Sequence, residues 1–257
     1  MRVLKIVGVV VIVIILAAGA AGFALLGGLQ GATAGPELGV GIDRVQAGYA
    51  SAYLLDAGNG QFVLIDAGSD NKGTALLQDL QAHHAGPDNV VAVLLTHSHP
   101  DHIAALPLFP KAMVYASKRE VPLAAGQEDY NGPMFKVMGE RNATPFNVAQ
   151  PLDDGQTFMV GNLQITAYSV PGHTEGSAAY LVNGVLFVGD AIQFASNGRV
   201  IGPSVIFSTD RAQGEASLKH LAQELQPHAA EVKFVASGHT GTVAGMGALA
   251  SFGGGGA

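Results

Sequence analysis

The stretch that most constrains the fold is residues 89–102, where a short apolar run leads directly into side chains that can bind metal. The letters NVVAVLL predict a buried β-strand, because short runs rich in Val and Leu suit a sheet interior. The following letters, THSHPDH, place His97, His99, Asp101 and His102 within six residues. A chain with 9 histidines in 257 residues therefore gathers three of them where a strand ends. Loops at strand ends commonly carry binding groups, so we expect a metal site there.

Local geometry supports a compact cluster. His97 and His99 are two residues apart and point the same way if the segment is extended. Pro100 favours an extended residue before it and is itself a common first residue of a helix. Asp101 and His102 would then lie in the first helical turn, folded back toward the other imidazoles. The chain has no cysteine, so a metal must be held by nitrogen and oxygen, which zinc accepts.

Three later segments repeat the pattern of a strand followed by a turn with a possible ligand. They are SVPGHTEGS with His173, LFVGDA with Asp190 and FVASGHTG with His239. A single histidine at a strand end is more often structural than catalytic. The joint occurrence of all these positions favours one shared site.

Elsewhere strand-like and helix-like runs alternate. Two apolar runs joined by GNG at residues 58–60 and a second NG at 183–184 predict hairpins. The segment TDRAQGEASLKHLAQELQ predicts a helix that begins at Thr209 or Asp210. Residues 117–150 look irregular, and SKRE within them suggests a solvated helix start. The order predicts an α/β domain over residues 36–252, with two sheets face to face and helices outside.

The two ends of the chain differ from this domain. Residues 1–35 contain Arg2 and Lys5 followed by an uncharged apolar run over residues 6–26. That run is long enough for a membrane-spanning helix, and the preceding cations favour an N-terminus in the cytoplasm. A cleaved signal peptide is the competing interpretation. The first places a membrane-anchored domain outside the cytoplasm, and the second gives a secreted or periplasmic one. Residues 253–257, GGGGA, predict a flexible tail.

Charge argues against nucleic acid as a partner. Residues 1–28 hold two cations and no acids, which leaves 11 Lys and Arg against 20 Asp and Glu in the rest. Proteins that bind nucleic acid usually carry a basic patch, and none is evident here. A small-molecule substrate is therefore expected, with the membrane as the other partner through the N-terminal segment. Nothing in the sequence indicates the oligomeric state.

The motif H-x-H-x-D-H, together with PGHTEGS, VGD and SGHTG, resembles the metallo-beta-lactamase superfamily. The resemblance implies a four-layer αββα sandwich, preceded here by the N-terminal hydrophobic helix. It implies two zinc ions per chain, with iron or manganese as alternatives. One metal would be held by His97, His99 and His173, the second by Asp101, His102 and His239, and Asp190 would bridge them.

The same resemblance implies a binuclear zinc hydrolase with a ligand set like that of glyoxalase II. A hydroxide between the metals would attack the carbonyl of an ester, thioester, lactone or lactam. Asp101 would orient this nucleophile as well as bind metal. Asp66, in LIDAG, is either hydrogen-bonded to a ligand imidazole or a turn former. Substrate choice is expected in residues 127–150 and 191–208. Tyr130 or Phe194 can line the cleft there, but loop packing is the more expected role for either side chain.

Two other interpretations stay open. A mononuclear iron dioxygenase of the persulfide type uses the same fold with fewer metal ligands. A non-catalytic metal-holding domain at the membrane is the third possibility, although its ligand set would be expected to be degraded. Oxygen consumption separates the first from a zinc hydrolase.

Overall fold

The computed structural model describes residues 38–39, 41–138 and 144–253. The hydrophobic helix predicted within residues 1–35 lies outside this part of the chain, as does most of the predicted tail. Among the described residues, no helix is both long enough and apolar enough to cross a membrane.

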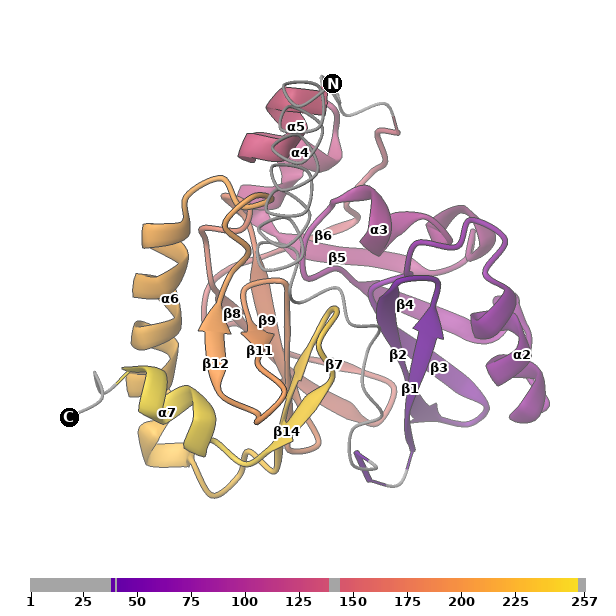
Figure 1. The fold of residues 1–257 in the computed structure, drawn as a ribbon. Coiled ribbons are helices and arrows are strands. Elements are labelled where there is room, and N and C mark those ends of the chain that lie inside the picture. Colours follow the sequence, from indigo (N-terminus) through magenta and orange to yellow (C-terminus); the bar gives the residue numbers. More distant parts are fainter. Residues whose placement is uncertain (1–37, 40, 139–143, 254–257) are drawn as a thin grey trace, which may run out of the picture.

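Two six-stranded sheets form the body of the protein (Figure 1). Strands of the first sheet follow each other in chain order: β1 (Ile42–Ala47), β2 (Ala50–Gly58), β3 (Gln61–Ile65), β4 (Val90–Leu94), β5 (Met113–Ser117) and β6 (Gln150–Leu152). The strands β1 to β3 pair antiparallel, and β3 to β6 pair parallel. The carboxyl ends of β3, β4 and β5 therefore meet at one edge of the sheet.

The second sheet contains the later strands. In spatial order it consists of β14 (Thr242–Ala244), β13 (Phe234–Ser237), β10 (Val185–Gly189), β9 (Ala178–Val182), β8 (Leu163–Ser169) and β7 (Thr157–Val160). Only the pair β10 and β13 is parallel, so the ends of these two strands also lie side by side. A separate two-stranded ribbon, β11 (Gln193–Phe194) and β12 (Val200–Gly202), follows β10.

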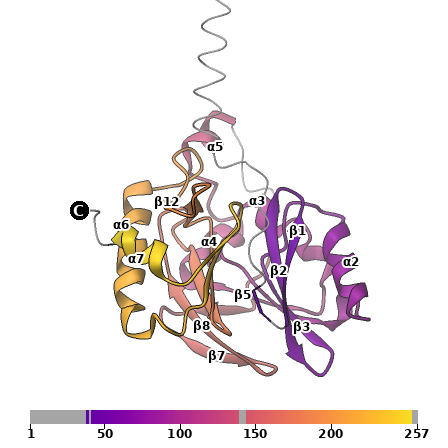
Figure 2. The same ribbon diagram turned by 60° about the horizontal axis from the view of Figure 1, so that its bottom comes forward.

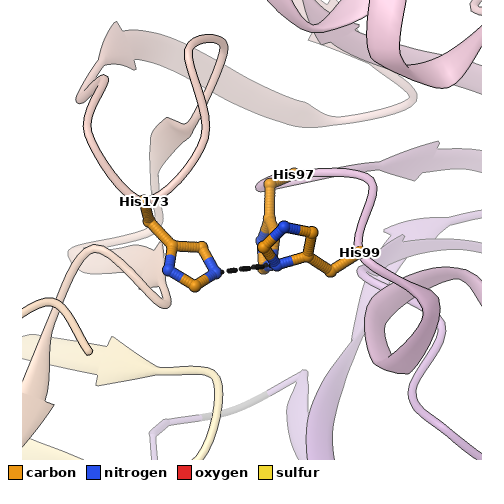
Figure 3. A group of neighbouring side chains, drawn as sticks. All are labelled: His97, His99 and His173. Atoms are coloured by element: carbon orange, nitrogen blue, oxygen red, sulfur yellow. Dashed lines mark hydrogen bonds between the residues drawn. The ribbon is translucent and has the colours of Figure 1, made fainter. Parts of the chain in front are cut away.

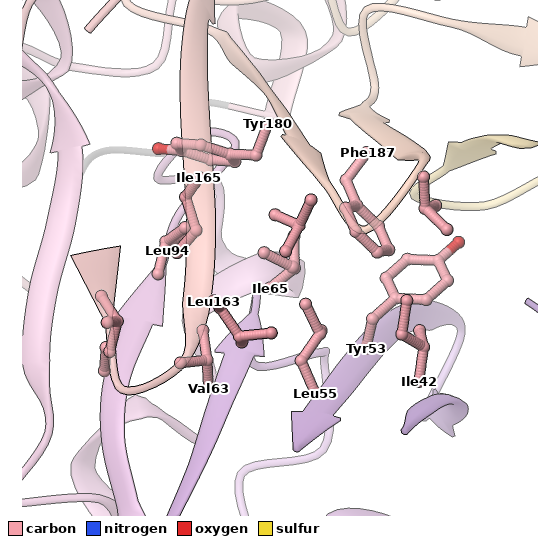
Figure 4. Packing of buried hydrophobic residues seen from close by; sticks show 14 of the residues in the cluster. Ile42, Tyr53, Leu55, Val63, Ile65, Leu94, Leu163, Ile165, Tyr180 and Phe187 are labelled. Carbon is pink, nitrogen blue, oxygen red and sulfur yellow. The ribbon is translucent and has the colours of Figure 1, made fainter. Parts of the chain in front are cut away.

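The main core lies between the two sheets (Figure 4). Side chains of the first sheet, including Tyr53, Leu55 and Ile65, pack against Tyr180 and Phe187 of the second. Along β2, residues alternate between this core and the opposite face, because successive side chains of a strand point to opposite faces. Both faces are buried, which explains why the strand reads as a continuous apolar run.

Helices cover the outer faces of both sheets (Figures 1 and 2). The helix α2 (Thr74–Ala82) packs Leu76 and Leu80 onto the first sheet. Helix α6 (Arg211–Glu224) packs Leu218 and Leu221 onto the second, beside α7 (Gly247–Gly253). Asp210 caps α6 by accepting a hydrogen bond from the Gln213 amide at 2.9 Å, so the helix begins at the second of the two predicted positions. The fold thus has four layers, helix, sheet, sheet and helix, as expected from the sequence.

Short elements complete the chain. These are α3 (Pro100–Ile103), α4 (Val121–Ala124), α5 (Pro133–Met138) and the 3-10 turns η1 (Pro87–Asn89), η2 (Leu106–Leu108), η3 (Lys118–Glu120) and η4 (Gln226–His228). The expectation that SKRE is a solvated helix start is wrong for Ser117 and Glu120, which are buried, whereas Lys118 and Arg119 are exposed. Glu120 is only 1% exposed, because η3 continues from the carboxyl end of β5 and the loop that carries Gly176 packs directly against it.

Candidate metal centre

The motif residues lie in the loop after β4 and in the first turn of α3. His99 is in the extended region, with φ −65° and ψ 152°, and Pro100 is the first residue of α3. This is the geometry that a residue before proline prefers. Asp101 and His102 lie in the first turn of α3 and return toward His97, whose ring centroid is 4.1 Å from that of His102.

The structure brings all seven predicted ligands together in two adjacent groups. The first contains His97, His99 and His173, and the second contains Asp101, His102, Asp190 and His239. In the first group, Nε2 of His173 lies 2.9 Å from Nδ1 of His99 and 3.2 Å from Nε2 of His97 (Figure 3). Three ring nitrogens thus converge on one point from the two different sheets.

Asp190 lies between the groups. Its Oδ2 is 3.1 Å from Nε2 of His239 and 3.6 Å from Nε2 of His173. His102 Nε2 is 3.4 Å from its Oδ1, yet this buried oxygen accepts no hydrogen bond within the described residues. Asp101 approaches from the other side, 3.2 Å from Nε2 of His239. A buried polar oxygen without a hydrogen bond is costly, and a bound cation would satisfy it.

Hydrogen bonds fix the tautomers of two imidazoles through Asp66. Thr96 Oγ1 donates to Asp66 Oδ2 at 2.7 Å, so its contact with Nδ1 of His97, at 3.1 Å, requires that nitrogen to donate. Nδ1 of His102 also donates to Asp66 Oδ2, at 2.8 Å. Both rings therefore leave Nε2 without a proton on the side of the site when they are neutral, which is the form that binds metal.

Two other imidazoles are oriented by partners that the sequence did not suggest. Nδ1 of His239 donates to the backbone carbonyl of Tyr49 at 3.0 Å. Nδ1 of His173 lies 3.1 Å from Oγ of Ser208. In both rings the nitrogen that faces the site is again Nε2. Each partner lies far along the chain from the histidine that it contacts. No local sequence pattern therefore indicated these contacts.

Asp66 combines the two roles that its sequence context allows. It has φ 57°, a left-handed conformation unusual outside glycine, as expected of a residue in a tight turn. It also accepts hydrogen bonds from the backbone and hydroxyl of Thr96 and from His102. The strained backbone places this buried carboxylate next to His102 and to Thr96, which contacts His97. Strain of this kind is often found at functional sites.

The first group is electrically neutral. Burial, followed by the neighbouring imidazoles, holds the pKa of His97 and His99 well below the ordinary value. Burial also lowers the pKa of His173 to about 4, although Asp190 opposes this shift. All three rings are therefore neutral at neutral pH, each with one ring nitrogen that has a free lone pair.

The second group is charged. Burial opposes protonation of His239, but Asp190 and hydrogen bonds to both aspartates outweigh it and raise its pKa to about 10. The carboxylates of Asp190, Asp66 and Asp101 likewise outweigh burial at His102 and hold its pKa well above the ordinary value. Burial alone would raise the pKa of Asp101, but His102 and His239 lower it to about 2. The metal-free second group thus holds imidazolium–carboxylate pairs.

Metal binding to the second group should release protons, because His239 and His102 must lose theirs before they coordinate an ion. The stability that these raised pKa values give the metal-free protein is complete below pH 6.5 and is lost as pH rises through about 10. We therefore expect zinc affinity to increase between pH 6.5 and pH 9. Zinc titration by calorimetry in buffers of different ionisation enthalpy measures the protons released. Zero release at pH 7 would contradict this charge assignment.

A cavity of about 510 Å³ opens beside His99. Tyr130 and Phe135 form an aromatic wall, with ring centroids 5.3 and 4.7 Å from that of His99. Tyr130 therefore lines the cavity, although loop packing was the more expected role for it, whereas Phe194 is not among the lining residues. Arg119 and Lys136 also line it.

A family model described as the metallo-beta-lactamase superfamily matches residues 45–234. A hydroxyacylglutathione hydrolase of Aeromonas hydrophila is 36% identical over 135 residues, which are 51% of this chain and 42% of that protein. A probable polyketide biosynthesis zinc-dependent hydrolase of Bacillus subtilis is 31% identical over 164 residues, or 62% of this chain and 59% of that protein. These matches thus span about half the length of the relatives.

Solved structures agree on the fold. A metallo-beta-lactamase family protein of Thermus thermophilus has a TM-score of 0.59 at 23% identity, covering 84% of this chain and 78% of that one. A B3 metallo-beta-lactamase with an active-site glutamic acid has a TM-score of 0.60 at 26% identity, covering 80% of each chain.

Proposed function

Because the chain belongs to the metallo-beta-lactamase superfamily, we propose that it is a hydrolase that holds two zinc ions and cleaves a carbonyl-centred bond of a small molecule. One observation carries the proposal: seven nitrogen- and oxygen-bearing side chains converge in two groups, with Asp190 facing both. The first group would hold one ion and the second group the other, with Asp190 between them.

The donor set fits zinc. Each group offers imidazole nitrogens, and the second adds carboxylates, which are the ligands that zinc takes when cysteine is absent. The imidazoles of His97, His102 and His239 each have the far nitrogen engaged by a hydrogen-bond acceptor. A ring held in this way is more basic and is already oriented, so it loses less conformational entropy when an ion binds.

Zinc, when bound, lowers the pKa of a coordinated water and polarises a substrate carbonyl. The chain's own residues then position the reactants. The side chain of Asp101 is 21% exposed, against 12% for Asp190 and 10% for His239, so it borders the open side of the site. Its low pKa keeps it ionised over the neutral range. Asp101 can therefore accept a hydrogen bond from the attacking nucleophile and orient it.

The cavity beside His99 suggests where substrate binds. Its volume of about 510 Å³ is within the range of small-molecule sites. Leu123, Tyr130 and Phe135 give it an apolar wall next to the metal centre, suited to the acyl part of a substrate. The likeness to a hydroxyacylglutathione hydrolase supports a thioester as the first substrate to test, and the likeness to a zinc-dependent hydrolase supports zinc as the metal.

The test is hydrolysis by the full chain loaded with zinc. Acyl thioesters, lactones, carboxylic esters and β-lactams are offered in parallel, and oxygen is recorded in the same cell. We expect hydrolysis of at least one class, its loss on chelation, its return with zinc, and no oxygen uptake. Oxygen uptake by the iron-loaded protein, without hydrolysis of any carbonyl substrate, would instead indicate the iron dioxygenase.

A further inference from the structure

A second buried carboxylate, Glu120, lies beside the metal centre and has no part in the chemistry described so far. It is 1% exposed and ends η3, which continues from the carboxyl end of β5. Burial raises its pKa, while hydrogen bonds from Ser98, Thr174 and Gly176 oppose that shift. A carboxylate in so dry a place is costly to bury unless it is satisfied by donors.

The contacts of Glu120 join two segments that carry ligands. Its Oε1 accepts hydrogen bonds from the backbone N–H and the hydroxyl of Ser98, both at 2.6 Å. Its Oε2 accepts one from the hydroxyl of Thr174 at 2.7 Å. Ser98 is the residue between His97 and His99, and Thr174 follows His173. All three rings of the first group thus stand next to a residue that Glu120 holds.

Close packing reinforces this connection. A Cβ at Gly176 would overlap the backbone of Glu120, so the loop that carries His173 lies directly against η3. Ser177 extends the network, because its hydroxyl lies 2.9 Å from the Thr174 hydroxyl and accepts from the Thr174 amide at 2.9 Å. The Ala178 amide also donates to the Thr96 carbonyl at 2.8 Å. Glu120 therefore lies where the two sheets meet.

We propose that Glu120 is a positioning residue that assembles the three-histidine metal site by tying the His97–His99 loop of one sheet to the His173 loop of the other. Asp66 orients the motif histidines through its hydrogen bonds with Thr96 and His102. Glu120 reaches no imidazole among its hydrogen-bond partners in the described residues, and it acts through the backbone of Ser98 and the side chain of Thr174. The proposal rests on the proposed function, since it presumes that the first group binds an ion.

Replacing Glu120 should weaken zinc binding mainly at the site formed by His97, His99 and His173. Removing groups that orient metal ligands typically weakens metal binding by about 10- to 100-fold. We expect Glu120→Ala to weaken zinc binding at the three-histidine site by this factor and to change the other site by less than about 3-fold. Glu120→Gln should fall between wild type and Glu120→Ala, because its amide retains one oxygen for Ser98 but cannot accept from Thr174.

Double variants show which of the two metal sites depends on Glu120. In a His239→Ala background, zinc binding depends mainly on the three-histidine group, and Glu120→Gln should weaken it. In a His173→Ala background, zinc binding depends mainly on the other group, and Glu120→Gln should leave it unchanged within about 3-fold. Zinc dissociation constants, from competition with a chromophoric chelator, are the readout and require no substrate. Glu231→Gln, at an exposed glutamate paired with His228, is the matched control.

Two smaller changes serve if the Glu120 variants fail to fold. Thr174→Val keeps the side-chain shape but removes one donor to Glu120, and Ser98→Ala removes another. Each should weaken zinc binding in the His239→Ala background only. Equal losses in both backgrounds, or no loss in either, would overturn the inference. If the wild-type chain binds no zinc, the proposed function itself fails. If it binds two zinc ions with affinities that do not change in the Glu120 variants, only the role of Glu120 fails.

Discussion

Replacing Asp190 with alanine should lower hydrolysis by at least about 1000-fold, which corresponds to roughly 4 kcal/mol of transition-state stabilisation. Asp190 is the carboxylate that faces both groups, 3.1 Å from His239 and 3.6 Å from His173. Without it, His102 and His239 lose the carboxylate that contributes most to holding their pKa values up. Steady-state rates on the substrate found by screening, with zinc content measured on the same samples, check this prediction.

The matched control for Asp190→Ala is Asp88→Ala. Asp88 is exposed and pairs with Lys111 at 2.6 Å on the surface, where an ion pair contributes little. It should retain wild-type rates and zinc content. If Asp190→Ala kept activity within about 10-fold of wild type, Asp190 could not be a shared ligand of the two ions.

Gly238→Ala should disable the metal centre while leaving the fold intact. A Cβ at Gly238 would collide with Oδ1 of Asp190 and lie 2.7 Å from Cε1 of His102. The backbone has little room to shift, because the Gly238 carbonyl accepts from Ser51 at 2.7 Å and its amide donates to Gly189 at 2.9 Å. The added methyl therefore displaces two ligands at once.

We expect Gly238→Ala to lower zinc affinity and hydrolysis by about 100-fold or more, since overpacking of a rigid site costs about 1–3 kcal/mol and displaces two of the groups that hold metal. Chelator competition and activity assays measure the loss, and thermal unfolding of the metal-free protein checks the fold. Gly247→Ala is the control, because nothing lies within 4 Å of a Cβ there. Equal losses in the two variants would show that the effect is not local to the site.

The strand-end argument correctly predicted that the ligand side chains lie close together, because it depends on local order along the chain. The strands β4, β10 and β13 each deliver a ligand to a turn, and the parallel pairing of β10 with β13 brings Asp190 and His239 together. The GNG turn between two apolar runs likewise predicted the hairpin of β2 and β3, and the candidate capping residues Thr209 and Asp210 marked the start of α6. Such signals place the elements along the chain, and the fold then follows from packing their buried faces.

The supporting contacts could not be read in the same way. Tyr49 meets His239 across 190 positions of sequence through a backbone carbonyl, which any residue type supplies. Glu120 looked like part of a charged, solvated turn, and its burial depends on the loop between β8 and β9, which packs against η3. Its position shortly after β5, beside the motif strand, was the one available signal, since parallel neighbours end at the same edge.

The central claim is that two zinc ions lie in two groups joined by Asp190. Elemental mass spectrometry of the full chain, purified without chelators, tests it most directly when the Asp190→Ala variant is measured in parallel. We expect about two zinc ions per wild-type chain and clearly fewer in the variant. About one iron ion per chain, unchanged in the variant, would contradict the two-zinc site and favour the dioxygenase.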